Sequence, residues 1–370
     1  MSDDLRERLR RTRRVPTPWG AERGFSGAGL DDLLDRWANN YDWGVHERRI
    51  AGLPWETAGE LRVIHQRAAD PAAPVVVLLH GWPDSVLRFE RVLPLLTDLQ
   101  VVVPALPGFP FAAPLTAPGM SVNRIAGLVA DALEALGYSH YTVSGGDVGG
   151  AVAEVLAAEH SDRVTALHLT NTAPQHAFTV DPAKLAPDAA AFLELAGQWF
   201  RAEGGYIATQ STRPNTLAVA LGDSPAGLAA WIVEKLESWS DDGAFTPDDL
   251  LTWVTAYWVS GAIGTSFATY AEPAVLPERV ETPTVLSVFA GDTKPEPRSY
   301  AEVFVNVREY VQHPAGGHFA AWEQPIAYVD DLRRAVRLVD GVDDGLHDGG
   351  RDGDGGDDQE QGGDRVGANG

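Results

Sequence analysis

The sequence predicts an α/β fold in which helices cover both faces of a mostly parallel, doubly wound sheet. From Leu61 onward, short runs of β-branched residues alternate with longer helical stretches, which is typical of a parallel sheet. Between about residue 176 and residue 278 this rhythm stops, and the chain becomes helical and rich in tryptophan. A helical insertion between two strands predicts a lid over the sheet. We also expect a helical extension before the first strand.

The N-terminal extension is expected to begin with a short surface helix. Residues 1–14 place Leu5 and Leu9 at helical spacing among arginines. Such a start is also compatible with a transit peptide or a membrane-surface helix, but the interspersed acidic residues favour an ordinary surface helix. A second helix is predicted over residues 30–43.

The first half of the sheet is predicted from alternating strands and helices. The strands lie at residues 75–79, 99–106, 141–145 and 164–171, and the helices at 120–137 and 151–160. The helix at 120–137 is the clearest, because its apolar residues share one face, Ser121 or Asn123 stands near its start and Gly137 closes it.

The second half of the sheet follows the insertion. We predict strands over residues 282–291 and 306–313 and a last helix over about 325–339. Residues 341–370 are rich in Gly and Asp and cannot bury enough apolar surface to fold, so a disordered acidic tail is expected.

Composition disfavours several kinds of partner and chemistry. The net charge of −23 repels nucleic acid and anionic membranes. The chain has no cysteine, so thiol nucleophiles, thiolate metal ligands and disulfides are excluded. His313 and His318 flank a Pro-Ala-Gly-Gly loop, a poor frame for metal ligands, and we expect no metal and no cofactor. The longest aliphatic run, Val75 to Leu79, is too short to cross a bilayer and no apolar signal core follows the charged N-terminus, so we expect a cytoplasmic protein.

The most informative residue is Asp147, in the run Ser-Gly-Gly-Asp-Val-Gly-Gly at residues 144–150. A sharp turn from strand to helix needs small residues two before and two after its centre, and Gly145 and Gly149 meet this need. The turn would lift the carboxylate to the carboxyl end of the sheet, near a helix N-terminus that favours its anionic form. Hydrolases usually carry serine here, so an aspartate predicts catalysis through an alkyl ester. A glycine-rich turn with an incidental aspartate is the structural alternative.

The turn His80-Gly81-Trp82-Pro83 directly follows a predicted buried strand. We predict that the backbone amides of Trp82 and Val148 form an oxyanion hole beside Asp147. A purely structural turn, held by His80, stays open as the alternative.

His318 is the histidine whose context predicts a catalytic base. It lies in a glycine-flanked loop after the last strand and before the last helix, where a doubly wound hydrolase sheet presents its base. Its orienting acid should follow the preceding strand, and Asp292 fits that position. Glu296 and Glu302 are nearby competitors.

With these residues in place, the chain resembles the microsomal-type epoxide hydrolases of the α/β-hydrolase superfamily. The resemblance covers most of residues 1–340 and rests on HGWPDS, LPGF, SGGDVGG, GGHFAAWEQP, an N-terminal segment like that family's and, most specifically, the lid stretch that begins GYIATQSTRPNT. It implies an α/β-hydrolase fold with a helical lid. The expected parts are an epoxide-hydrolase-like N-terminal region at 1–60, the hydrolase core at 61–175 and 279–340, the lid at 176–278 and the disordered tail at 341–370.

The resemblance implies a role for each site residue. Asp147 is implied as the nucleophile, His318 as the base and Asp292 as its orienting acid, while Tyr206 and Tyr270 on the lid hydrogen-bond the epoxide oxygen. The implied substrates are an epoxide and water, the product is a vicinal diol, and no cofactor is expected. The many aromatic residues of the lid suggest that the epoxide is apolar. For each tyrosine, an aromatic side chain of the lid core is the alternative.

Three features depart from the family pattern. Val148 stands where the family usually has Trp, Pro110 and Ala112 alter the loop PGFPFAA, and the acid position Asp292 is followed by the proline-rich stretch TKPEPRSY, which leaves its register open. A haloalkane dehalogenase is the nearest rival, although halide binding needs N–H donors such as the Trp that Val148 replaces. A non-hydrolytic scaffold that binds or cyclises an epoxide is a second alternative. The oligomeric state stays open, with a homodimer among the alternatives.

Overall fold

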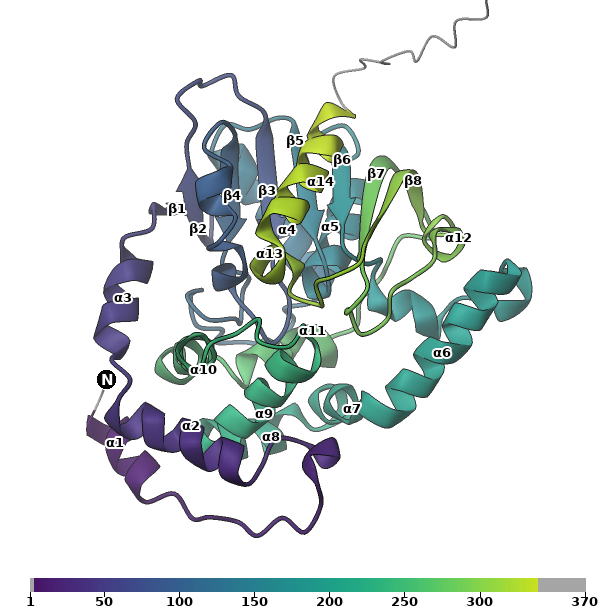
Figure 1. The fold of residues 1–370 in the computed structure, drawn as a ribbon. Helices are drawn as coiled ribbons and strands as arrows, with labels where there is room; N and C mark the ends of the chain where they lie inside the picture. The colour runs from purple at the N-terminus through teal and green to yellow at the C-terminus, as the bar shows by residue number, and fades with distance from the viewer. Residues whose placement is uncertain (1–2, 339–370) are drawn as a thin grey trace, which may run out of the picture.

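The computed structural model describes residues 3–338, so the tail predicted at 341–370 lies outside the described residues. Its centre is an eight-stranded sheet in the order β1-β2-β4-β3-β5-β6-β7-β8 (Figure 1). The strands are β1 (Trp55–Ala58), β2 (Leu61–Gln66), β3 (Val75–Leu79), β4 (Gln100–Pro104), β5 (Tyr141–Gly145), β6 (Val164–Leu169), β7 (Val280–Phe289) and β8 (Val305–His313). Only the pairings of β1 with β2 and of β2 with β4 are antiparallel. The predicted mostly parallel sheet is therefore confirmed.

The sheet begins earlier than the sequence pattern predicted. β1 starts at Trp55 rather than at Leu61 and forms a hairpin with β2 through Gly59, whose φ is +55°. The Trp55 indole donates a hydrogen bond of 2.8 Å to the carbonyl of Ile50. A four-residue strand at the edge of a sheet has too few residues for a recognisable alternation of apolar side chains, which is why the pattern missed it.

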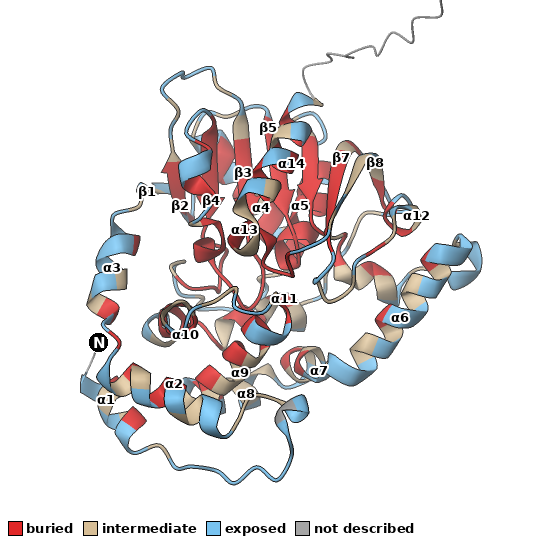
Figure 2. Cartoon of the chain, in the orientation of Figure 1, coloured by how far each residue is buried: buried red, intermediate tan, exposed pale blue. Residues whose placement is uncertain are grey.

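Helices cover both faces of the sheet, and alternate residues of β3 show why. Val77 and Leu79 belong to the apolar cluster that includes the inner faces of α4 and α5, whereas Val76 and Leu78 belong to a second cluster with α14. Successive side chains of a strand point to opposite faces, so a continuous apolar run is buried on both. Figure 2 shows the central strands β3 to β6 as buried almost throughout, whereas the edge strand β8 is only partly buried. The helices are α4 (Val122–Ala135), α5 (Val148–Glu159), α12 (Arg298–Ala301), α13 (Ala320–Glu323) and α14 (Pro325–Arg337).

The N-terminal extension consists of α1 (Asp3–Arg10), α2 (Ala28–Asn39) and α3 (Trp43–Ala51). The single helix predicted over residues 30–43 is wrong, because the chain breaks after Asn39. The Asp42 carboxylate accepts a 2.9 Å hydrogen bond from the amide of Gly44, so it caps a new helix instead of continuing the old one.

The insertion between β6 and β7 forms the lid. Its helices are α6 (Pro187–Glu203), α7 (Gly205–Thr212), α8 (Pro214–Asp223), α9 (Pro225–Ser238), α10 (Pro247–Ser260) and α11 (Ala268–Ala271). Most of them begin with proline, whose fixed φ suits a first helical turn. In Figure 1 they lie below the sheet, and α1 and α2 pack against the far side of α9.

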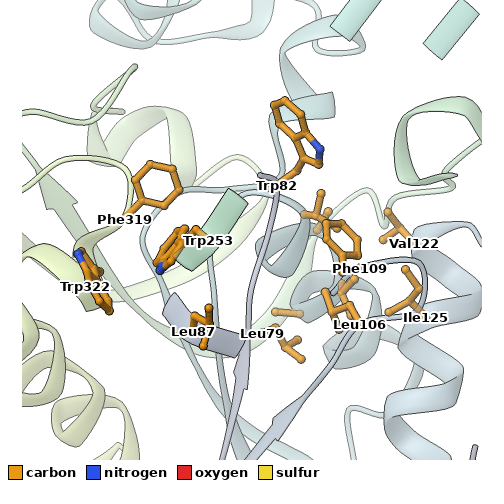
Figure 3. Close-up of a cluster of buried hydrophobic side chains, with 14 of the residues drawn as sticks. Leu79, Trp82, Leu87, Leu106, Phe109, Val122, Ile125, Trp253, Phe319 and Trp322 are labelled. Carbon is orange, nitrogen blue, oxygen red and sulfur yellow. The ribbon is translucent and has the colours of Figure 1, made fainter. Parts of the chain in front are cut away.

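Contacts with the segment after β8 and with the N-terminal extension hold the lid in place. Trp253 of α10 packs against Phe319 and Trp322, which follow the loop after β8 (Figure 3). Arg36 of α2 pairs with Asp248 of α10 at 2.8 Å, so the N-terminal extension braces the lid.

Over residues 3–338 no single helix is long and apolar enough to span a bilayer. Only α8 and α9 taken together have the length and composition of a membrane span, and the pair is bent by 113°.

Candidate active site

Asp147 stands at the junction of β5 and α5, with φ 55° and ψ −129°. This is an uncommon backbone conformation for a residue other than glycine. A Cβ atom on Gly145 would lie 2.4 Å from the carbonyl oxygen of Gly149, and a Cβ atom on Gly149 would lie 2.1 Å from that of Leu79. The turn therefore exists only because both positions are glycine, as the spacing predicted.

The Asp147 carboxylate meets the turn after β3. Its Oδ1 accepts a 2.9 Å hydrogen bond from the amide of Trp82, and its own amide donates to the side-chain oxygen of Asn171 at 3.1 Å. A Cβ atom on Gly81 would lie 2.5 Å from Oδ1, so the backbone approaches the carboxylate closely. Val148 is the first residue of α5, and the first N–H groups of a helix have no partner within it.

His318 lies between two carboxylates. Its Nε2 is 3.6 Å from Oδ2 of Asp147, and its Nδ1 is 2.9 Å from Oδ1 of Asp292. The competitors for the Asp292 position contact other groups: Glu296 accepts hydrogen bonds from Thr172, and Glu302 pairs with an arginine at 2.6 Å. The structure thus brings Asp147, His318 and Asp292 into one line of contacts.

The charges of Asp147, His318 and Asp292 shift one another's protonation, as the pKa values of His318 and Asp292 show. Burial disfavours the charged imidazole of His318, but the negative charge and 2.9 Å hydrogen bond of Asp292, together with the nearby carboxylate of Asp147, outweigh it and raise the pKa to about 9. Burial also opposes ionisation of Asp292, but the charge of His318 and its hydrogen bond lower that pKa to about 2. At neutral pH, an imidazolium therefore lies between two carboxylates.

Tyr206 of α7 and Tyr270 of α11 lie side by side in the wall of the cavity that contains Asp147. The Tyr206 ring stacks on Trp82 with centroids 5.2 Å apart, and the Tyr270 ring meets Trp82 edge-on at 6.0 Å. The two tyrosine rings are 6.1 Å apart. Burial, and then the charge of Asp147, raises the pKa of each phenol well above its ordinary value, so both remain protonated donors. Tyr257, by contrast, donates to the carbonyl of Asp84.

A cavity of about 240 Å³ joins these groups. Its lining includes Asp147, His318, Asp292, Tyr206 and Tyr270, the five side chains that the sequence singled out for catalysis. Val148, the residue after Asp147, also lines it.

Several residues that position the catalytic groups were not predicted from the sequence. Arg88 is buried, donates to Asp84 at 2.6 Å and also to the backbone carbonyl of His318. The Asp84 carboxylate in turn accepts from the amide of Gly81 at 2.8 Å. Asn171 ends a predicted strand beside that of Asp147, so its position at the carboxyl edge of the sheet could have identified it.

His80 holds its turn by accepting a 3.1 Å hydrogen bond from the amide of Leu106. Its ring also lies edge-on to Phe109, with centroids 5.0 Å apart. The structural role considered for His80 and the approach of the Trp82 amide to Asp147 therefore occur together. Among residues 3–338, no group of three or more His, Cys, Asp or Glu could hold a metal ion.

Comparison with known proteins identifies relatives over most of the chain. The profile described as alpha/beta hydrolase fold matches residues 74–202, and the one described as epoxide hydrolase N terminus matches residues 1–89. A protein of Stigmatella aurantiaca (strain DW4/3-1) named "Putative epoxide hydrolase" is 33% identical over 367 residues, covering 91% of this chain and 82% of that protein.

Two further relatives cover most of the chain. Epoxide hydrolase 1 of Sus scrofa is 27% identical over 91% of this chain and 86% of its own length. The structure of the Aspergillus niger epoxide hydrolase superposes with a TM-score of 0.81 at 27% identity, covering 91% of this chain and 93% of that one. The chain therefore belongs to the microsomal-type epoxide hydrolases of the α/β-hydrolase superfamily and is an ether-bond hydrolase.

Proposed function

We propose that the protein converts an apolar epoxide to a vicinal diol through a covalent ester on Asp147. The observation that carries the proposal is the shared cavity, in which the carboxylate, the His318–Asp292 pair and two protonated phenols meet. A nucleophile, a base with its orienting acid, and donors for the leaving oxygen are the groups that this reaction needs.

In the first step, Oδ2 of Asp147 attacks a ring carbon while the other carboxylate oxygen keeps its bond to the Trp82 amide. The carbon–oxygen bond of the strained ring breaks, and negative charge develops on the epoxide oxygen. Tyr206 and Tyr270 donate hydrogen bonds to that oxygen, which becomes a hydroxyl group. Because burial raises the pKa of both phenols, they donate without being ionised beforehand.

The ester changes the charge balance at His318. The charge of Asp147 is among the causes that raise the His318 pKa to about 9, and esterification removes that charge. The pKa of His318 therefore falls when the intermediate forms. Its imidazolium releases a proton to water while the epoxide oxygen takes one from water, so the charges balance. The histidine becomes a neutral base at the step that requires one.

In the second step, His318 takes a proton from water, and the water oxygen attacks the carbonyl carbon of Asp147. The resulting oxyanion develops where the Trp82 amide already donates, next to the first turn of α5. Asp292 stabilises the imidazolium through its 2.9 Å hydrogen bond. The acyl carbon–oxygen bond then breaks, and the diol leaves with the proton from His318. The new acid proton of Asp147 passes to His318, which restores the carboxylate and the imidazolium.

The intermediate can be trapped by removing the base. In His318→Gln, alkylation by styrene oxide should proceed while ester hydrolysis stops, so intact-mass spectrometry should show the protein plus one substrate. Asp147→Asn should show no adduct. His140→Gln, an exchange of the same kind at an exposed position, should turn over without accumulating one. If the His318 variant stays at its unmodified mass while the wild type is active, the two-step mechanism is wrong.

A further inference from the structure

Lys294 places a positive charge in the wall of the cavity. Lysine occurs in this chain only at positions 184, 235 and 294. Lys294 follows Asp292 in the loop after β7 and lines the cavity. Its Nζ atom lies 3.7 Å from the centre of the Trp199 ring and 5.1 Å from that of Phe200, both on α6. The ammonium group thus lies in the cavity wall next to the aromatic side chains of Trp199 and Phe200.

This ammonium group has unused binding capacity. It carries three N–H donors, and its hydrogen bond goes to the hydroxyl of the adjacent Thr293 at 2.9 Å. Among residues 3–338, no carboxylate forms an ion pair with it. Lys235 differs, because it pairs with Glu234 at 2.5 Å, and Lys184 is exposed.

The neighbouring carboxylates only partly offset the burial of the Lys294 charge. Burial lowers its pKa even though Asp292, Asp147 and Glu296 each act to raise it. Burial raises the pKa of Glu296 to about 7, so that group is only partly ionised at neutral pH, and both its oxygens already accept hydrogen bonds from Thr172. A desolvated cation that has free N–H donors and no ion pair among residues 3–338 would be stabilised by an incoming anion.

We infer that Lys294 binds a carboxylate carried by the substrate, so that the enzyme acts on epoxides with an apolar segment ending in an acid group. The epoxide would lie at Asp147 and the tyrosines, the apolar segment along Trp199 and Phe200, and the carboxylate at Nζ of Lys294. This inference rests on the proposed function and adds the substrate class. The rival role for Lys294 is general charge balance for the catalytic groups, which would affect acidic and neutral epoxides equally.

The test compares epoxides that differ only in charge. The first pair is para-carboxystyrene oxide and the corresponding para-carboxamide. The second pair is 5,6-epoxyhexanoate and the corresponding amide, 5,6-epoxyhexanamide. For the wild type we expect kcat/KM about ten- to hundredfold higher for the acid in at least one pair, the range of a charge-assisted hydrogen bond. Lys294→Met should abolish this preference, Lys294→Arg should retain part of it, and Lys184→Met is the control that should keep it.

The possible results are distinguishable. Equal turnover of acid and amide by the wild type in both pairs, or an undiminished preference in Lys294→Met, would overturn the role of Lys294. The first of these needs no variant, so it does not depend on whether the variant folds. If the wild type hydrolysed none of the epoxides, amides included, the proposed function itself would be wrong, and this inference with it.

Discussion

Removing Arg88 should reveal how strongly the site depends on a charge pair behind it. Arg88 and Asp84 are 2% and 1% exposed, and their nearest side-chain atoms are 2.6 Å apart. Burial opposes ionisation of Asp84, but the charge of Arg88, with His80 contributing, lowers its pKa, so the carboxylate is charged. In Arg88→Met the methionine fills much of the space, but Asp84 keeps a buried charge without its partner.

The cost of that charge is large compared with the loss of a surface pair. Breaking a buried ion pair by removing one partner destabilises by about 3–5 kcal/mol. The matched control is Arg333→Met, because Arg333 contacts both oxygens of Asp98 at 2.6 Å on the surface. Such exposed pairs contribute about 0–1 kcal/mol. Urea denaturation of both variants and the wild type measures the two differences in the free energy of unfolding.

The same variant should also lose activity. Arg88 donates to the carbonyl of His318, and Asp84 accepts from the amide of Gly81, next to Trp82. Loss of the pair therefore loosens both the base and the amide that meets Asp147, and kcat should fall more than in Arg333→Met. If both variants lost the same small amount of stability, the buried pair would not have the role assigned to it.

The remaining predictions concern the tyrosines and pH. Tyr206→Phe and Tyr270→Phe should each slow formation of the ester about ten- to hundredfold, since each removes one donor to a developing charge; an unchanged single-turnover rate would remove that tyrosine from the reaction. Because the His318 pKa is raised to about 9 in the folded state, its stabilising contribution is complete below pH ~6.5 and is lost as pH rises through about 9. The free energy of unfolding should therefore fall by roughly 2–3 kcal/mol over that range in the wild type and by clearly less in His318→Gln, and parallel pH profiles would contradict this.

Much of the fold could be predicted because the relevant signals are local. The central strands are continuous apolar runs, and the helix at 120–137 was recognised from its periodicity; Ser121 caps it and Gly137 follows it with φ +85°. The break between α2 and α3 was missed because Asn39 to Asp42 interrupts the helix without glycine or proline. The capping side chain of Asp42 starts a new helix instead of continuing the old one. The apolar periodicity of the flanking residues gives no sign of such a break.

Those parts of the site could be predicted whose backbone conformation permits only particular residue types. Gly145 and Gly149 mark a turn that excludes side chains, so Asp147 could be identified from spacing. Arg88 contacts the carbonyl of a residue 230 positions away, and no local pattern specifies such a partner. The orientation of Lys294 toward α6 likewise depends on how the lid packs. The cytoplasmic location and the homodimer stay predictions.

The most direct test of the ester mechanism is a single turnover in heavy-oxygen water with enzyme in excess over styrene oxide. Direct attack of water on the epoxide would place the label in the diol and leave the protein unlabelled. Attack by Asp147 followed by hydrolysis at its carbonyl carbon predicts the reverse. Mass spectrometry of the peptide containing Asp147 should then show one heavy oxygen, and the first diol released should contain none; a labelled diol with an unlabelled peptide would contradict the account.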